Sequence, residues 1–243
     1  MATPLKQIQR ELEAAGDPDK ARFLQGFFKT GPGQYAEGDR FRGLTVPVTR
    51  AIAKRYLALT WGELDSLLRA PFHEDRLAAL MVLTLRAEAK KASPAEKERI
   101  LDFYLARTRF VNNWDLVDLS APSVVGRRLV ERNDPSLLFK LALSSLLWER
   151  RIGMVASHAF IRARQTPVAY ILAEMLLGDR HDLMHKASGW MLREAGKRDP
   201  AGLKTFLGKH AGVMPRTMLR YSIERLSPAE RLRWMQVRSA PAT

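Results

Sequence analysis

The stretch "SPAE" at Ser93–Glu96 combines three features of a helix start, and it occurs again at Ser227–Glu230. The serine is a preferred N-cap, the proline occupies the first helical position, and the glutamate three residues after the cap completes a capping box. Three further sites, "DPSLL" from Asp134, "TPVAY" from Thr166 and "DPAGL" from Asp199, pair a cap residue with proline but lack the glutamate. One kind of helix start therefore recurs along the chain.

The starts recur at an interval that fits a pair of helices. From residue 93 to residues 134, 166, 199 and 227, the separations are 41, 32, 33 and 28 residues. Between the starts, apolar residues recur at spacings of three and four, and strand-like alternation is scarce. Helix pairs with a period of about 30 to 45 residues are typical of α-solenoids of the HEAT or armadillo type. We therefore expect an all-α fold, an α-solenoid of HEAT-like helical repeats with a concave basic face. Because the period is irregular, an ordinary helical bundle stays an alternative.

The composition indicates a basic protein that binds a polyanion. Among 243 residues, Lys and Arg number 40 and Asp and Glu number 26, which leaves a formal net charge of +14. Such an excess predicts attraction to nucleic acid or to an anionic membrane. Cysteine is absent, which excludes disulfides and thiolate metal sites and fits a reducing cytoplasm.

No segment indicates a signal peptide or a membrane span. The N-terminal residues contain no long apolar run, and nowhere do about 18 apolar residues run together. We expect a cytoplasmic monomer without membrane contact. Residues 1–235 are expected to form a single HEAT-like repeat domain, and residues 236–243 a flexible C-terminal tail.

One segment departs from the helical pattern. "KTGPGQYAEGDRFRGLTVPVTR", residues 29–50, holds four glycines and two prolines and predicts a long loop. Glycine-rich loops can hold phosphates through backbone N–H groups. Here no G-K-[ST] is present and no strand precedes the loop, so we expect a structured connector and no nucleotide cofactor.

A tryptophan lies among basic residues in "HKASGWMLREAGKRD", residues 185–199. On a helix with about 100° per residue, four of these side chains fall within about 60° of one another. They are Lys186, Trp190, Arg193 and Lys197. Another direction, better suited to the core, is shared by Ala187, Met191 and Ala195. An aromatic surface flanked by cations suits nucleic acid. The alternative is a tryptophan at the edge of the core beside a solvated basic face.

A second basic face lies in "LLWERRIGMVASHAFIRAR", residues 146–164. Arg151, His158 and Arg162 share one side of the expected helix. The macrodipole does not favour arginine near a helix start, so Arg150 and Arg151 should find partners elsewhere. A guanidinium binds a carboxylate or a phosphate with paired hydrogen bonds, and either would serve.

The stretch "NNWDLVDLS", residues 112–120, places two aspartates in this basic chain. Asn113 is a good N-cap, which makes Trp114 the first helical residue and Asp115 a first-turn acid that suits the helix dipole. Asp118 lies beyond the reach of capping, and its i+4 spacing puts it on the same face as Trp114. The alternative to a functional role is that Asp118 pairs with a nearby arginine, such as Arg127, Arg128 or Arg151.

Metal and nucleophile chemistry have weak support. His181 and His185 have the i, i+4 spacing that can ligate zinc, but Asp182 replaces the glutamate of H-E-x-x-H and no third ligand is obvious. There is no cysteine and no G-x-S-x-G motif. We expect no metal site and no nucleophilic triad.

Taken together and in order, "WDLVD", "WERR" and "GWMLREAGK" resemble the AlkD-like family of DNA alkylation-repair glycosylases, over roughly residues 5–235. The resemblance implies HEAT-like repeats wrapped around duplex DNA that contains alkylated bases, so that the protein would be nucleoid-associated when bound. It also implies excision of cationic bases such as N3-methyladenine and N7-methylguanine, without flipping of the base into a pocket. No cofactor is implied.

The resemblance assigns roles residue by residue. Trp114 and Asp118 become the active-site indole and carboxylate, Trp190 the second aromatic, and Arg151 the arginine of the middle motif, with Arg150 in its place if the alignment shifts by one. Arg193 becomes a contact to the DNA backbone, and the further expected DNA-binding residues are Lys186, Lys197, Arg150, Phe27 and Arg162. Phe27 stands where the family has a tyrosine, and the loop over residues 30–43 is longer than in some members.

The implied chemistry suits these side chains. A cationic purine is already a good leaving group, so the remaining task is to stabilise positive charge on the sugar. A fixed carboxylate and indole faces can both do this. The main alternative is a non-catalytic HEAT-like module that binds duplex or branched DNA, which would need the basic faces but not Trp114 and Asp118. A protein-binding solenoid would leave the net charge without a purpose.

Overall fold

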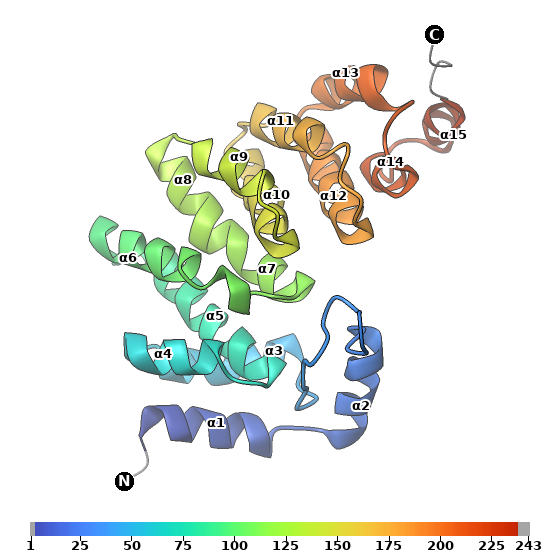
Figure 1. The fold of residues 1–243 in the computed structure, drawn as a ribbon. Helices are drawn as coiled ribbons and strands as arrows, with labels where there is room; N and C mark the ends of the chain where they lie inside the picture. The colour runs from blue at the N-terminus through green and yellow to red at the C-terminus, as the bar shows by residue number, and fades with distance from the viewer. Residues whose placement is uncertain (1–2, 238–243) are drawn as a thin grey trace. The chain divides into compact units, whose positions relative to one another are not determined.

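Helices and the loops that join them build residues 3–237, the part of the chain that the computed structural model describes (Figure 1). No strand occurs in that range, and the only β-type pairing there is an isolated parallel bridge between Arg40 and Phe72. The all-α prediction is confirmed. Within the described residues, the backbone forms two compact units, which divide between Ser120 and Ala121. One domain over residues 1–235 stays a prediction, and residues 238–243 of the expected tail lie outside the described range.

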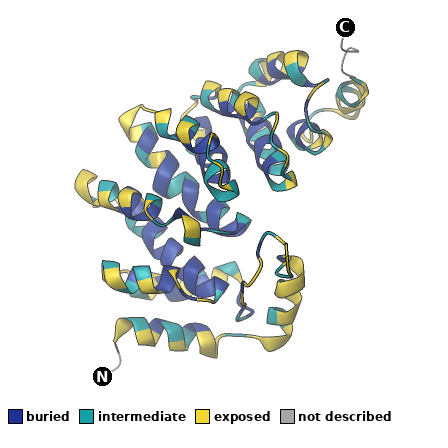
Figure 2. Cartoon of the chain, in the orientation of Figure 1, coloured by how far each residue is buried: buried dark blue, intermediate teal, exposed yellow. Residues whose placement is uncertain are grey.

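The first unit is built around one buried helix, α5. Its elements are α1 (Pro4–Ala14), α2 (Pro18–Phe27), α3 (Val46–Ala53), η1 (Lys54–Tyr56), α4 (Trp61–Leu68), α5 (His73–Glu88), α6 (Pro94–Leu105), η2 (Thr108–Phe110) and α7 (Trp114–Ala121). Helices α3, α4 and α6 all pack against α5. Figure 2 shows the contrast between the largely buried α5 and the largely exposed α2.

The second unit consists of helices in two layers. Its elements are a π-helical segment η3 (Pro122–Gly126), α8 (Arg127–Arg132), α9 (Ser136–Ala142), α10 (Leu147–Arg162), α11 (Pro167–Met175), α12 (Asp182–Arg198), α13 (Pro200–His210), α14 (Arg216–Ser222) and α15 (Pro228–Gln236). Helices α10, α12 and α14 contact one another in succession, and so do α9, α11 and α13. Successive stacked helix pairs are the arrangement of an α-solenoid, as the spacing of the helix starts predicted.

The predicted helix starts are where the sequence placed them, within one residue. Ser227 and Glu230 form a complete capping box, and the side chain of Ser93 accepts a hydrogen bond from the N–H of Glu96. Asp199 accepts from the N–H of Gly202 at the start of α13. Thr166 precedes α11, but its hydroxyl donates to the Asp199 carboxylate instead of capping the helix. Local cap chemistry therefore accounts for three of these five helix starts, at Ser93, Asp199 and Ser227.

The expected loop over residues 29–50 is shorter than predicted, because α3 already begins at Val46. Thr45 caps this helix by accepting from the N–H of Val48, and Pro47 lies in its first turn, a cap-plus-proline start that the glycine content obscured. The loop is a structured connector, as expected. The buried Glu74 of α5 accepts hydrogen bonds from the N–H groups of Arg42, Gly43 and Leu44.

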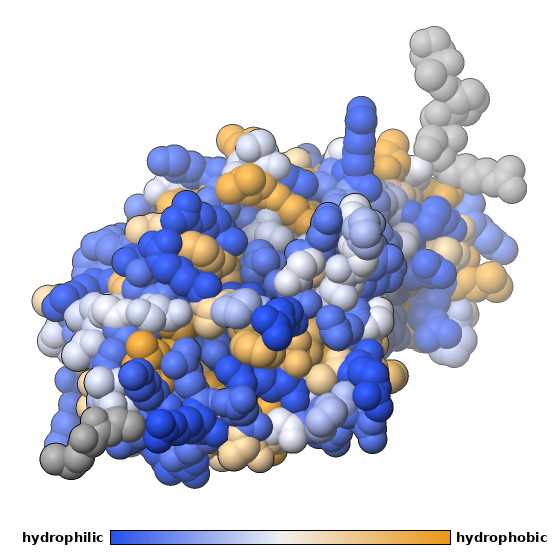
Figure 3. Space-filling model, turned by 60° about the horizontal axis from the view of Figure 1, so that its bottom comes forward, coloured by the Kyte–Doolittle hydropathy of each residue, from blue (hydrophilic) through white to orange (hydrophobic). Residues whose placement is uncertain are grey.

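The surface is mostly hydrophilic on the face drawn in Figure 3, where hydrophobic residues form small patches between charged ones. Within the described range, no helix is long and apolar enough to cross a membrane. This agrees with the absence of long apolar runs in the sequence.

Candidate functional site

Helix α7 begins at Trp114, as predicted, and local hydrogen bonds hold its start. The side-chain oxygen of Asn113 accepts from the N–H of Trp114 at 2.8 Å. Asp115 Oδ1 accepts from the N–H of Leu116, also at 2.8 Å. A carboxylate in this position also suits the positive end of the helix dipole. The interpretation of Asp115 as a helix-start acid is therefore confirmed, and its second oxygen has a further role in a buried ion pair.

The indole of Trp114 packs in an aromatic cluster in the first unit. It stacks on the buried ring of Phe28, with ring centroids 5.2 Å apart and an angle of 16° between the planes. Phe27 meets it edge-on at 6.2 Å and is 54% exposed. Phe27 and Trp114, which lie far apart in sequence, are thus brought together. The half-buried indole keeps part of its surface accessible beside an exposed aromatic ring.

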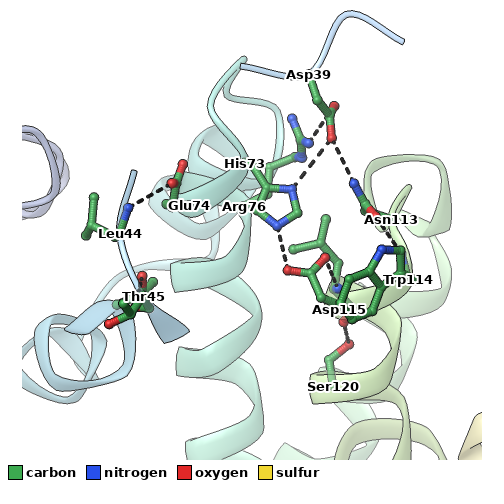
Figure 4. Close-up of polar contacts among 12 residues, drawn as sticks. Asp39, Leu44, Thr45, His73, Glu74, Arg76, Asn113, Trp114, Asp115 and Ser120 are labelled. Carbon is green, nitrogen blue, oxygen red and sulfur yellow. Dashed lines mark hydrogen bonds and ion pairs between the residues drawn. The ribbon is translucent and has the colours of Figure 1, made fainter. Parts of the chain in front are cut away.

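Behind Trp114 lies a polar network that the sequence did not reveal (Figure 4). His73 Nε2 is 2.7 Å from Asp115 Oδ2, and His73 Nδ1 is 3.6 Å from Asp39 Oδ2. Arg76 Nη2 is 2.7 Å from Asp39 Oδ1, and the Asn113 amide donates to Asp39 Oδ2 at 3.4 Å. All five side chains are buried. Asp115 is therefore also one half of a buried ion pair, which dipole arguments alone did not predict.

The network sets the protonation of its members. Burial by itself would lower the pKa of His73, but the nearby carboxylates of Asp115 and Asp39 outweigh burial and raise that pKa to about 9. Burial acts to raise the pKa of Asp39, yet His73 and Arg76 lower it below its ordinary value. At neutral pH His73 is an imidazolium between two carboxylates.

Asp118 lies one turn beyond Trp114 on α7 and is partly buried. Tyr104 on α6 is fully buried, and its hydroxyl is 3.0 Å from Ser120 Oγ on α7. Burial raises the pKa of Tyr104, and the negative charge of Asp118 acts in the same direction. Asp118 is therefore close enough to the protein interior for its charge to be felt there. Two of the arginines considered as its partners, Arg127 and Arg128, both contact Glu131.

In the second unit, Trp190 lies at the edge of the core beside His158. The two ring centroids are 6.2 Å apart, with 32° between the planes. The predicted core direction of α12 is confirmed, because three side chains there are fully buried: Ala187, Met191 and Ala195. Burial lowers the pKa of His158; Glu194 opposes this effect, and Arg162, Lys197 and Arg198 add to it. Cations therefore gather around this aromatic pair.

The predicted basic side chains of α12 have carboxylate partners. Lys186 Nζ is 2.8 Å from Asp182, Lys197 Nζ is 2.7 Å from Glu194, and Arg193 contacts both Glu194 and Glu224. Exposed ion pairs, such as Lys186–Asp182, contribute little to stability, so they can be exchanged for phosphate contacts at small cost.

The two arginines at the start of α10 differ in their surroundings. Arg150 Nε is 2.6 Å from Asp179 Oδ2, and its Nη1 donates to the carbonyl groups of Ser144 and Ser145. The expectation of a carboxylate partner is met for Arg150. Arg151 is buried and donates to the carbonyl oxygen of Leu183 at 2.5 Å. Arg162, at the other end of α10, is exposed.

The two histidines considered as zinc ligands both form hydrogen bonds at the start of α12. His181 Nδ1 accepts from the N–H of Leu183 at 3.2 Å, and His185 Nε2 donates to the carbonyl of Asp179 at 2.6 Å. Among the described residues, no cluster of three or more His, Cys, Asp or Glu side chains is arranged to hold a metal ion.

Two comparisons relate this chain to known proteins. The family model for the DNA alkylation repair enzyme matches residues 8–226. Among solved structures, a predicted DNA alkylation repair enzyme from Enterococcus faecalis is similar, with a TM-score of 0.66 and 15% sequence identity. That match covers 88% of this chain and 97% of the other. At this identity the structural similarity shows a shared fold. No curated protein matches the sequence.

Proposed function

Because this chain belongs to the DNA alkylation repair enzyme family, we propose that it is a DNA glycosylase acting on cationic alkylated purines in duplex DNA. The substrates are N3-methyladenine and N7-methylguanine, and the bond that it hydrolyses is the N-glycosidic bond, without conventional base flipping. The observation that carries the proposal is the position of Trp114 and Asp118. An accessible indole and a partly buried carboxylate lie one turn apart on α7, whose start contacts the buried network around His73.

The proposed reaction needs no acid to protonate the leaving base. As the C1′–N bond breaks, its electron pair moves to the alkylated base, which leaves as a neutral molecule, and positive charge builds on the sugar. The Asp118 carboxylate stabilises that charge and orients the water that adds at C1′, and the water proton passes to solvent. The face of Trp114 carries a negative quadrupole that acts in the same sense. A neutral nucleoside develops this charge less readily, so damaged bases are favoured.

The second unit is proposed to bind the DNA backbone. Trp190 and Arg151 retain the catalytic assignment that the family motifs imply. Arg193 contacts a phosphate. The other cations of the two basic faces do the same, and these are Lys186, Lys197, Arg150 and Arg162. The partner is alkylated duplex DNA bound by a monomer, with no nucleotide cofactor, in the cytoplasm and at the nucleoid.

Substitution of the proposed carboxylate tests the function directly. Asp118→Asn should lower the single-turnover release of N7-methylguanine from methylated duplex DNA by on the order of 10²-fold, because the fixed charge facing the sugar is lost. Affinity for the same duplex should change little, since the neutral amide of asparagine repels a phosphate no more strongly than the carboxylate does. Free base is counted by chromatography, and affinity by fluorescence anisotropy.

The matched control is Asp102→Asn, which neutralises an exposed carboxylate on α6 of the same unit. It should release base at the wild-type rate. Equal release by wild type and Asp118→Asn would exclude Asp118 as the catalytic carboxylate. Tight DNA binding without any base release by the wild type would point instead to a non-catalytic DNA-binding module.

A further inference from the structure

The buried network behind Trp114 is electrically balanced only when His73 carries a proton. Asp39 and Asp115 contribute two negative charges, and Arg76 contributes one positive charge. Each of these four residues is at most 7% exposed. An uncompensated charge at such depth is strongly unfavourable, so the imidazolium form of His73 completes the network.

The charged groups that face His73 come from several elements. Asp115 approaches from α7, Asp39 from the loop before α3, and Arg76 from the next turn of α5. Glu74 and Lys20 also border a cavity of about 180 Å³ that His73 lines, and Glu74 is already engaged by three backbone N–H groups of the loop. Among the described residues, Asp39 and Asp115 are the only carboxylates that form an ion pair with His73.

Two separate routes lead from His73 to Trp114. The polar route runs from His73 to Asp39, from Asp39 to the Asn113 amide, and from the Asn113 oxygen to the backbone N–H of Trp114. The aromatic route runs through Phe28, whose ring centroid lies 5.1 Å from His73 and 5.2 Å from the Trp114 indole. Chains of contacts thus connect both the backbone and the ring of Trp114 to the imidazole.

We propose that His73 is a positioning residue for the candidate active site: bridged between Asp39 and Asp115, it holds Trp114 and the start of α7 in place. Asp118 follows one turn later on the same helix, so its position depends on the same contact. The consequence for base release rests on the proposed glycosylase function, whereas the effect on Trp114 does not.

The test separates charge balance from simple packing. His73→Gln removes the positive charge but keeps a side chain that can donate a hydrogen bond, which leaves one uncompensated carboxylate. His73→Gln/Asp115→Asn removes one charge of each sign and restores the balance. The matched control is His210→Gln, which changes a histidine of the second unit that lies 3.4 Å from Glu174.

Two measurements are made on each variant. The first is single-turnover release of N7-methylguanine between pH 7 and 9.5, corrected for release without protein. The second is the indole N–H resonance of Trp114 in ¹H–¹⁵N spectra, assigned with Trp114→Phe. We expect His73→Gln to slow release by about tenfold and to shift the Trp114 resonance. The double variant should recover most of the release rate and most of the resonance position. His210→Gln should match wild type in both measurements. In the wild type, the resonance should move as His73 loses its proton on the alkaline side.

The outcomes that overturn the proposal are distinct from failure of the glycosylase function. An unmoved Trp114 resonance in His73→Gln and across the wild-type titration contradicts the positioning role. So does a double variant that is at least as impaired as the single one. If the wild type releases no methylated base, the proposed function fails, and the Trp114 resonance alone then decides whether His73 positions it. The wild-type titration needs no variant of His73, so poor folding of His73→Gln leaves the test intact.

Discussion

Two aspartates three residues apart on α7 have different environments, and this difference separates their roles. Asp115 is buried and is compensated by His73, so its charge belongs to the structure. Asp118 is partly exposed on the face that follows Trp114. A carboxylate that has to stabilise a transient cation must remain accessible to the substrate. We therefore expect substitutions of Asp115 to act through stability and the position of Trp114, and those of Asp118 through the reaction itself.

The raised pKa of His73 predicts a dependence of stability on pH. A group whose pKa rises to about 9 on folding, from an ordinary value of 6.5, stabilises the fold fully below pH 6.5. That contribution, on the order of 3 kcal/mol, is lost as the pH rises through 9. Urea unfolding of wild type and His73→Gln at several pH values from 6 to 10 measures it. The gap between the two free energies of unfolding should narrow with rising pH, and a constant gap would contradict this assignment of charge.

At the scale of elements, close contact between helices depends on small residues as much as on apolar ones. Gly126, in the π-helical segment η3, lies against α10 so closely that a Cβ there would be 2.1 Å from the carbonyl oxygen of Ala156. Segment η3 and helix α10 pack together at this point. The obstacle is backbone, which cannot move aside as a flexible side chain can.

Gly126→Ala should therefore destabilise the protein by about 1–3 kcal/mol, because η3 and α10 must separate to admit the methyl group. Urea unfolding followed by circular dichroism measures the change. Gly208→Ala on α13 is the matched control, since no atom lies within 4 Å of its added Cβ. Alanine is a better helix former than glycine by about 0.8–1.0 kcal/mol, so the control should be neutral or stabilising. Equal effects of the two substitutions would mean that the close approach at Gly126 is not needed.

The chain carries a net charge of +14. Some of its lysines form exposed ion pairs, such as Lys186–Asp182 and Lys197–Glu194. Phosphates can replace these carboxylates, with release of counterions from DNA. The charge does not specify the fold, but it predicts how binding responds to salt.

Affinity for duplex DNA should fall steeply with added salt. If about six phosphates are contacted, the association constant should drop on the order of 10³-fold between about 50 and 200 mM salt. Fluorescence anisotropy over a salt series gives the slope of log K against log salt concentration. Lys197→Gln should weaken binding to every sequence alike and reduce the magnitude of that slope by about one. Affinity that does not respond to salt would rule out a binding surface made of these cations.

Much of the secondary structure follows from short-range sequence. "SPAE" at residues 93–96 and 227–230, "DPAGL" at 199 and the Asn113–Trp114 step all predicted helix starts that the structure has. Caps act over three or four residues, so their information is local. The start of α3 at Val46 was missed, since four glycines nearby favoured a loop over residues 29–50.

The all-helical class, the positions of most helix starts, the basic charge and the motif that contains Trp114 and Asp118 can all be read from the sequence. Which polar groups meet depends on how the helices pack. His73 and Asp115 are 42 residues apart, and Arg150 and Asp179 are 29 apart. Nothing in the residues around His73 distinguishes a buried imidazolium from a surface histidine. Its partner is chosen by the packing of α5 against its neighbours, and the free energy of a buried charge depends on that partner rather than on the local sequence.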